Sequence, residues 1–356
     1  MKALIAMSGG VDSSVAAYLT KEQGLECIGC TMKLFESEDA GVSSSKVCCS
    51  LDSVEDARSV AFSIGIPFYV FNYKDEFRQK VIGKFADEYM RGLTPNPCIE
   101  CNTHLKFGKL VQRAKELGCS YVVTGHYARV TFDGKQYHLL RGLDPSKDQS
   151  YVLYTLTQEH LSMLRLPLGE YNKDEVRKIA ARQGFVNADR PDSQDICFVP
   201  DGDYAAAIER FTGKAPGPGD FVDAEGKVLG KHKGIIHYTV GQRKGLGIAF
   251  GEPIFVVRTD PHTNTVMLGK NEDLFYRHVK IRDVNWISGE APQAPVNVQA
   301  KLRYRQQAAD ALLLPEGTDR AELVFGQPQR APAPGQAAVF YDGDEVLGGG
   351  IIEHAF

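Results

Sequence analysis

Short, continuously apolar runs alternate with amphipathic segments along the first 125 residues. Four runs have the length and hydrophobicity of buried strands, and they span 2–6, 25–32, 66–71 and 121–124. Four segments have apolar residues at helical spacing, and they span 15–24, 52–63, 74–90 and 105–117. A capping-box pattern at Asn172 and Glu175 predicts a further helix that ends near Gly184. Because strands that alternate with helices form a parallel sheet covered on both faces, a doubly wound α/β domain is predicted.

The sequence changes character after residue 212. Several glycines and prolines lie between 213 and 219, and short alternating runs typical of strands continue to the end. We predict three domains: an α/β domain at 1–212, a small β-rich domain at 213–275 and a β-barrel-like domain at 276–356. Turns are expected in the last domain at 342–343 and 348–350. The segment 33–50 has no periodicity and is predicted to be a loop.

A glycine-rich turn, Met7–Ser14, joins the first predicted strand to the first predicted helix. Backbone N–H groups converge at such a turn and the helix dipole adds positive potential, so the turn is suited to bind an anion. Its pattern is S-G-G-x-D-S, which differs from the G-x-x-x-x-G-K-[ST] and G-x-G-x-x-G nucleotide loops. Asp12 would repel a phosphate unless a cation lay between them. We interpret the turn as a pyrophosphate cradle with a divalent metal, magnesium by preference; the alternative is a tight glycine turn capped by Asp12.

Two further residues are predicted to lie beside this turn. Ligands of doubly wound sheets bind at the carboxyl ends of the strands. Met32 ends the second predicted strand and Gly125 follows the fourth, so both are expected in the same crevice. Met32 is a candidate wall for an adenine ring, or alternatively a core residue.

The chain is slightly acidic, with 356 residues, a net charge of −4 and a pI of about 6.2. It therefore has no general attraction for nucleic acid, and such binding needs local basic patches. Two stretches qualify, 231–244 and 301–306. If the second is a strand, its three cations share one face, where they could position phosphates while Tyr304 stacks a base; the alternative is a solvated strand face. No apolar run has membrane-spanning length, so a membrane is not expected as a partner. DNA is not expected either, because the chain has no overall basic field.

Eight cysteines in a chain without a signal peptide point to the reducing cytoplasm, where thiols are buried, catalytic or metal-bound. Cys27 and Cys30 fall on opposite faces of a strand, so they are not expected to share a zinc ion. With Cys119, they are predicted to be small apolar core residues. Cys48 and Cys49 are adjacent in the predicted loop and are poorly placed to bind one metal together.

Cys98 and Cys101 lie where a Pro-Asn-Pro sequence permits a helix to start, because proline favours the first turn. Residues three apart on that turn lie on one side, and thiols at a helix N-terminus form thiolates readily. The pair is therefore a candidate nucleophile or metal-ligand set. Cys197 lies between two apolar residues and near two aspartates, so it is either a core residue or part of a polar rim.

Together these landmarks resemble the bacterial tRNA-specific 2-thiouridylases, a family of the ATP-pyrophosphatase (PP-loop) superfamily, along essentially the whole chain. The motif S-G-G-x-D-S alone would indicate only the superfamily. The resemblance rests on an ordered series of motifs: SGGVDSS at 8–14, TPNPCIECN at 94–102, KF at 106–107, TGHY at 124–127, RGLDPSKDQSY at 141–151, DICF at 195–198, HYTVGQRKGLGI at 237–248, RYRQ at 303–306 and PGQAAVFYDG at 334–343.

The resemblance implies a PP-loop ATP-pyrophosphatase domain followed by two tRNA-binding β domains, and a role for each matching residue. Cys197 would carry a persulfide received from a sulfur-donor protein, and Cys101 would be the nucleophile that resolves it. ATP, with magnesium, would be bound by Ala6, Met7, Ser8, Gly9, Gly10, Val11, Asp12, Ser13, Met32 and Gly125. The tRNA would be contacted by Asn96, Pro97, Cys98, His126, Lys147, Asp148, Gln149, Arg303, Tyr304 and Gln336.

The implied reaction is adenylation of the 2-carbonyl of the wobble uridine, position 34 of tRNA, followed by sulfur transfer that gives 2-thiouridine, AMP and pyrophosphate. Many family members have aspartate where this chain has Cys98. In the family that aspartate is proposed as a general base contacting the target uridine. Either this base is dispensable here, or the Cys98 thiolate substitutes for it, or Cys98, Cys101 and Cys197 hold an iron–sulfur cluster that delivers sulfide. Two readings outside the family also remain: a small-molecule ATP-pyrophosphatase that transfers an amide nitrogen, and an idle tRNA-binding protein that retains nucleotide.

Overall fold

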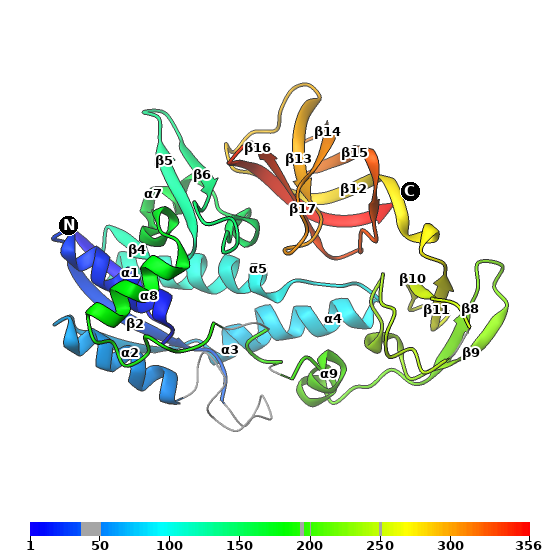
Figure 1. Ribbon diagram of the computed structural model, residues 1–356, viewed down its shortest axis with the longest axis horizontal. Helices are drawn as coiled ribbons and strands as arrows, with labels where there is room; N and C mark the ends of the chain where they lie inside the picture. Colours follow the sequence, from blue (N-terminus) through cyan, green and yellow to red (C-terminus); the bar gives the residue numbers. More distant parts are fainter. Residues whose placement is uncertain (37–50, 193–195, 200, 249–250) are drawn as a thin grey trace.

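The computed structural model describes residues 1–36, 51–192, 196–199, 201–248 and 251–356 (Figure 1). Its first part contains a five-stranded sheet in the order β3-β2-β1-β4-β7, in which every pair of neighbours is parallel. The predicted parallel α/β fold is confirmed. The strand order reverses between β1 and β4, which is where such sheets bind ligands. The strands are β1 (Lys2–Ala6), β2 (Glu26–Lys33), β3 (Phe68–Asn72), β4 (Tyr121–Val123) and β7 (Leu164–Arg165).

Helices cover both faces of this sheet: α1 (Val11–Glu22), α2 (Leu51–Ser63) and α8 (Lys173–Arg182) on one face, and α6 (Leu110–Glu116) on the other. Alternate residues of β1 belong to the two faces, with Ala3 and Ile5 in one buried cluster and Leu4 in the other. Cys27 and Cys30 are divided between the same two clusters, so they fill opposite faces of the core as predicted. Burial raises the pKa of both thiols.

Two long helices extend from the sheet toward the β domains (Figure 1). The first lies where it was predicted, whereas the second begins at Pro97 rather than at residue 105. The middle segment of each is π-helical, a feature frequent at functional sites, and the second π segment directly follows Cys101. Their consecutive segments are α3 (Lys74–Phe77), η1 (Arg78–Gly83) and α4 (Lys84–Met90), then α5 (Pro97–Cys101), η2 (Asn102–Lys109) and α6.

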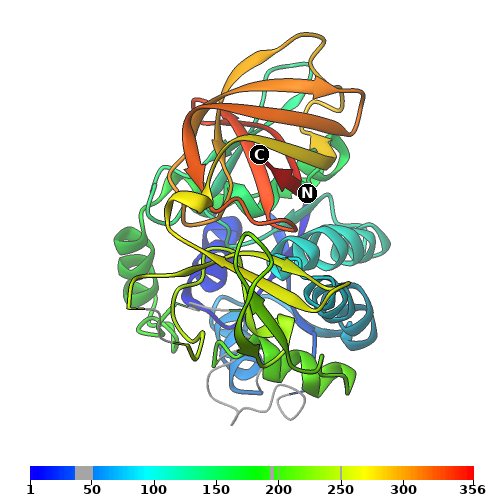
Figure 2. The same cartoon turned by 90° about the vertical axis from the view of Figure 1, so that its right-hand side faces the viewer.

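The rest of the chain forms a central β domain and a C-terminal β-barrel, as predicted (Figure 2). The central sheet has the order β10-β11-β8-β9, and the barrel closes because β12 pairs with both β15 and β17. The exact boundaries at 212 and 275 stay predictions. The strands are β8 (Gly219–Val222), β9 (Val228–His232), β10 (Phe255–Asp260), β11 (Thr265–Gly269), β12 (Phe275–Trp286), β13 (Val296–Lys301), β14 (Ala309–Glu316), β15 (Arg320–Arg330), β16 (Ala337–Asp342) and β17 (Glu345–Ala355).

A hairpin from the α/β domain extends the barrel sheet. Its strands, β5 (Ala128–Phe132) and β6 (Tyr137–Arg141), have no counterpart in the sequence-based prediction. β6 pairs with β17, and His138 lies 2.7 Å from Glu345 of that strand. Arg129 forms a second ion pair across the junction, 2.9 Å from Asp344. The α/β domain and the barrel are therefore joined by a continuous sheet as well as by the connecting chain.

Two strand-level predictions in the barrel are wrong. The segment 348–350 is not a turn but the middle of β17, where a Cβ on Gly348 would lie 2.3 Å from the carbonyl oxygen of Asn285. These glycines therefore serve close strand packing, while the turn expected at 342–343 does join β16 to β17. The segment 301–306 is a strand only at Lys301; the following residues bend away, so its three cations do not share a strand face.

The remaining helical segments are short, and no helix in the described ranges is long and apolar enough to cross a membrane. They are α7 (Gln158–Met163) and α9 (Tyr204–Thr212), with 3-10 turns at Ser150–Leu153, Pro167–Glu170, Ile235–His237 and Glu272–Leu274.

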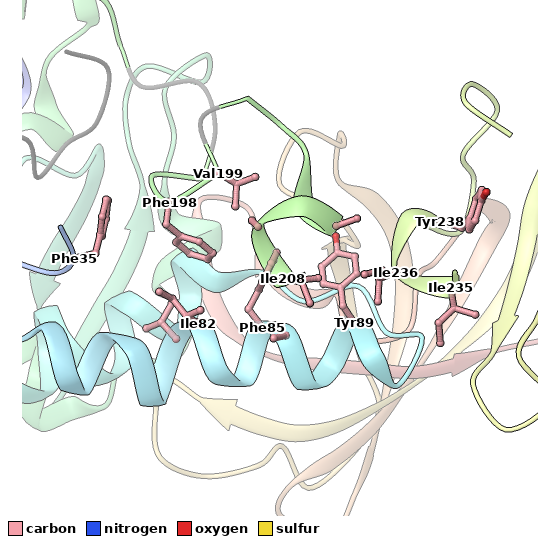
Figure 3. Close-up of a cluster of buried hydrophobic side chains, with 14 of the residues drawn as sticks. Phe35, Ile82, Phe85, Tyr89, Phe198, Val199, Ile208, Ile235, Ile236 and Tyr238 are labelled. Carbon is pink, nitrogen blue, oxygen red and sulfur yellow. The ribbon is translucent and has the colours of Figure 1, made fainter. Parts of the chain in front are cut away.

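The largest buried cluster joins the α/β domain to the central β domain (Figure 3). Phe85 and Tyr89 of α4 face Phe198 from the segment between α8 and α9, and Ile208 of α9. Ile236 of the central domain closes the cluster. We call it the junction cluster; in it, Phe198 of the short described segment 196–199 packs on Phe77 and Phe85 of the first long helix.

Candidate functional site

The turn after β1 is shaped by its own backbone and by Ser13. Gly10 is the N-cap of α1, and no described side chain caps it. The Ser13 hydroxyl accepts a hydrogen bond from the Ser8 amide (3.1 Å) and donates one to the Gly10 carbonyl (2.9 Å). Gly9 has a φ of +79°, and a Cβ there would lie 2.2 Å from the carbonyl oxygen of Ser53. Only glycine fits this bend, and the N-terminus of α1 that follows it is of the kind that suits an anion.

Asp12 does not cap the turn, which removes the contact on which the alternative interpretation depended. One of its oxygens accepts hydrogen bonds from the Tyr127 hydroxyl (2.7 Å) and from Lys173 Nζ (2.6 Å), and the other accepts from the same ammonium at 2.8 Å. Lys173 is 8% exposed and also pairs with Asp192, at 2.7 Å. The negative charge of Asp12 is therefore already compensated by a protein cation. Sequence analysis missed Lys173 and Tyr127, since no local pattern marks either residue.

The contacts of Asp12 continue into a segment predicted to bind tRNA. Asp192 joins Lys173 to Lys147, whose Nζ lies 2.8 Å away. On the other side, the Tyr127 amide donates to Gln149 Oε1 at 3.0 Å. Burial alone would raise the pKa of Asp192, but hydrogen bonds from the two lysines hold it below its usual value. A polar network thus connects the turn after β1, Met7–Ser14, to Lys147 and Gln149. We call this turn the loop.

Gly125 and Met32 have different relations to the loop. A Cβ on Gly125 would lie 2.9 Å from the backbone of Asp12 and Ser13, so the chain after β4 packs directly on the loop, as the fold rule requires. Met32 is half-buried near the end of β2 and packs against two buried clusters. Ala6 and Val11 flank the turn within β1 and α1.

The cysteine pair lies at a helix start, as predicted. Asn96 is the N-cap of α5: its side-chain oxygen accepts a hydrogen bond from the Cys98 amide (3.1 Å), and Pro97 occupies the first turn. Cys98 is exposed, whereas Cys101 is half-buried. The cap fixes the first turn, so both thiols are held on a defined side of the helix.

Cys101 and Cys197 share one hydrophobic neighbour, the junction cluster. Both are half-buried and pack against the junction cluster. Cys197 directly precedes Phe198, which is 1% exposed and is enclosed by the rings of three other phenylalanines. Cys197 is therefore at the edge of a core rather than inside it. Six of the cysteines lie among the described residues, and Cys48 and Cys49 lie outside them.

Tyr304 of the barrel packs beside Tyr151 of the α/β domain and Lys301. Its ring lies 5.9 Å from that of Tyr151, and Lys301 Nζ lies 5.8 Å from both ring centres. Burial raises the pKa of Tyr304, with smaller contributions from the charges of Asp148 and Cys98. Burial also lowers the pKa of Lys301. Lys301 therefore lies beside Tyr304, a predicted tRNA-binding residue, although the resemblance assigns no role to Lys301 itself.

The other residues predicted to contact tRNA have structural partners here. His126 is buried beside Thr124 (2.7 Å), and burial together with the charge of Lys106 holds its pKa well below the usual value. The Arg303 guanidinium donates to two backbone carbonyls, one from the central domain and one from the barrel. Asp148 accepts hydrogen bonds from backbone amides, and Gln336 is half-buried at the start of β16. Their contacts with tRNA stay predictions.

The described ranges hold no group of three or more His, Cys, Asp or Glu side chains placed to bind a metal ion. Cys98, Cys101 and Cys197 all lie in those ranges, so they do not assemble a cluster site in this conformation. In the loop, Asp12 already has Lys173 and Tyr127 as partners.

Three family models match consecutive parts of the chain: a tRNA methyl transferase HUP domain at 1–201, a tRNA methyl transferase PRC-barrel domain at 206–270 and an aminomethyltransferase beta-barrel domain at 276–352. Two curated relatives are named tRNA-specific 2-thiouridylase MnmA. The relative from Clostridioides difficile is 52% identical to this chain, over 99% of this chain and 98% of the relative. The relative from Acetivibrio thermocellus is 50% identical, over 99% of both chains. The chain belongs to the tRNA-specific 2-thiouridylase family.

Among solved structures, this chain is similar to a 4-thiouridine synthetase in complex with RNA and bound ATP, with a TM-score of 0.36 and 22% identity, covering 56% of this chain and 45% of that one. It is also similar to an NMN synthetase from Francisella tularensis, with a TM-score of 0.34 and 15% identity, covering 60% and 77% of the two chains.

Proposed function

We propose that this protein thiolates tRNA, converting the wobble uridine to 2-thiouridine with ATP and the sulfur of a cysteine persulfide. The observation that carries the proposal is the placement of Cys101 and Cys197 against one buried cluster, in a chain that also has a PP-loop. Relatives named as tRNA-specific 2-thiouridylases, aligned over 99% of the chain, supply the class of substrate.

The first step is activation of the base. The 2-carbonyl oxygen of uridine attacks the α-phosphorus of ATP, forming a C2–O–P bond and breaking the bond to pyrophosphate. The backbone amides at the N-terminus of α1 and the loop serines stabilise the charge on the departing pyrophosphate. Gly125 lets the chain after β4 pack directly against the loop, which places this segment beside the proposed ATP site. Met32 would flank the adenine.

The second step is sulfur transfer. The terminal sulfur of a persulfide on Cys197 attacks C2, and AMP leaves with the former carbonyl oxygen. The Cys101 thiolate then attacks Cys197 Sγ, which breaks the S–S bond and leaves sulfur on the base. A Cys101–Cys197 disulfide forms, and an external dithiol reduces it. The persulfide itself comes from a sulfur-donor protein.

The tRNA is held by the β domains and by the start of α5. Bases of single-stranded loops are commonly splayed out and stacked on aromatic rings, and Tyr304 offers such a ring. Lys147 and Gln149 belong to the network of Asp12, so the tRNA-binding segment and the loop would form one site. Asn96, Pro97, His126, Asp148, Arg303 and Gln336 complete the proposed tRNA contacts.

Magnesium is expected to accompany ATP, and when bound it neutralises charge on the phosphates. Asp12, the carboxylate of the loop, could share the ion with phosphate oxygens and water. The cysteines do not assemble an iron–sulfur site among the described residues, so no step is assigned to such a cluster.

The experiment is reconstitution in vitro. The protein is incubated with ATP, unmodified tRNA and a ³⁴S-labelled persulfide donor, and the tRNA is digested and analysed by mass spectrometry. We expect labelled 2-thiouridine from the wild type, none from Cys197→Ser or Cys101→Ser, and a normal yield from Cys27→Ser, whose thiol lies in the core of the sheet.

Two outcomes would contradict the proposal. ATP turnover supported by ammonia or glutamine without tRNA would identify a small-molecule amidating enzyme. Binding of tRNA and ATP without any turnover would identify an idle binding protein. We propose the cytoplasm as the location, in keeping with the buried thiols of Cys27, Cys30 and Cys119.

A further inference from the structure

The loop contains a charge conflict, because Asp12 projects from the first turn of α1, where an anion is expected. A carboxylate beside the phosphates of ATP would weaken their binding unless a cation compensated it. In this structure the compensating cation is an ammonium of the protein itself. Lys173 Nζ contacts both oxygens of Asp12, at 2.6 and 2.8 Å.

Lys173 is held firmly in this position. It is the first residue of α8, after the N-cap Asn172, and its own amide donates to Asp144 at 3.1 Å. The side chain is 10% exposed and its ammonium bridges Asp12 to Asp192. A buried lysine that links carboxylates from two distant segments is a costly arrangement when its role is stability alone, because desolvation offsets most of the attraction.

We propose that Lys173 is a phosphate-binding residue of the ATP site: its ammonium contacts a phosphate oxygen of bound ATP while retaining Asp192 as its partner. The inference rests on the proposed function, since it presumes that ATP occupies the loop. An incoming phosphate competes with Asp12 for the ammonium, and charge-assisted contacts to phosphate are strong in such a dry position. Asp12 is thereby released from Lys173 and can turn toward the magnesium that accompanies the phosphates.

Asp192, the second carboxylate partner of Lys173, has other cationic partners of its own. It pairs with Lys147 and Arg177 as well as with Lys173, so it stays anchored when the ammonium shifts toward phosphate. Asp192 does not bind ATP itself, since carboxylate and phosphate repel one another; it competes with the phosphate for the Lys173 ammonium.

The test compares the binding of ATP and adenosine by calorimetry in the wild type and in variants. Lys173→Met is expected to weaken ATP binding at least about tenfold while adenosine binding stays unchanged, because only ATP carries phosphates. Lys173→Arg is expected to recover most of the loss. The matched control is Lys178→Met, which removes an exposed lysine from the same helix and should leave both affinities unaltered.

Asp192→Asn separates binding from a structural role. If Lys173 binds phosphate, removing a competing carboxylate leaves ATP affinity equal or higher. Loss of ATP affinity in Asp192→Asn, equal loss of ATP and adenosine in Lys173→Met, or no loss in Lys173→Met would each overturn the inference. Failure of the wild type to bind ATP would instead overturn the proposed function, so the two failures are distinguishable.

Discussion

Replacement of Phe198 by alanine is expected to damage sulfur chemistry while sparing nucleotide binding. Phe198 is 1% exposed, and its ring packs edge-on against Phe77, Phe85 and Phe211 at centroid distances of 5.7, 5.3 and 5.9 Å. Removal of a buried phenylalanine costs about 3–5 kcal/mol, and each edge-to-face pair adds about 0.5–1.5 kcal/mol to such a contact. We expect the free energy of unfolding to fall by about 4 kcal/mol.

The effect on function should be selective because Cys197 is adjacent to Phe198, whereas the loop rests on a different buried cluster. Chemical denaturation gives the stability change, calorimetry gives the ATP affinity, and single-turnover thiolation gives the transfer rate. The control is Phe62→Ala, at a position that is 87% exposed on α2, where a change under about 0.5 kcal/mol is expected. Unchanged thiolation in a measurably destabilised Phe198→Ala protein would refute the claim that the junction cluster positions Cys197.

Three further predictions follow from single contacts. Gly9→Ala should abolish ATP binding because its Cβ meets a backbone carbonyl at 2.2 Å, whereas Gly24→Ala, with a similar φ of +78° and open space around it, should cost only about 1–2 kcal/mol in denaturation; equal effects would contradict the clash argument. Asn96→Ala removes the cap of α5 and should lower stability by about 0.5–2 kcal/mol and slow thiolation, with ATP affinity as the unaffected readout. The hydrogen bond to Glu345 raises the pKa of His138, so this contact stabilises the protein below the ordinary pKa of histidine and is lost as the pH rises through the raised value. The free energy of unfolding, measured by chemical denaturation, should therefore decline as the pH rises across that range, and the decline should be smaller in Glu345→Gln.

The pattern of the sequence was sufficient for four of the five strands of the parallel sheet, β1 to β4, and for the turn after β1, but not for the two-residue strand β7. Both signals are local in the sequence. Continuous apolar runs indicate buried parallel strands, and glycines between a strand and a helix indicate a tight turn at a helix N-terminus, which suits an anion. The signal for the helix start before Cys98 is also local, because Asn96 specifies it by capping and Pro97 by its fixed φ.

The features that were missed depend on contacts between distant segments. The β5–β6 hairpin is completed by β17, and its short strands give little signal without that partner. Lys173 acquires its role from Asp12 and Asp192, which lie far from it in sequence. The glycines at 348–350 resemble a turn in sequence, but the structure uses them for the close approach of neighbouring strands.

The central claim is that the loop activates the base by adenylation, and the fate of one oxygen atom tests it most directly. An anticodon stem-loop RNA carrying ¹⁸O at the 2-carbonyl of the wobble uridine is thiolated in a single turnover with unlabelled ATP, and the nucleotide products are analysed by mass spectrometry. The account predicts that AMP gains one ¹⁸O for each 2-thiouridine formed and that pyrophosphate gains none. The appearance of ¹⁸O in inorganic phosphate, or its absence from AMP, would contradict the account.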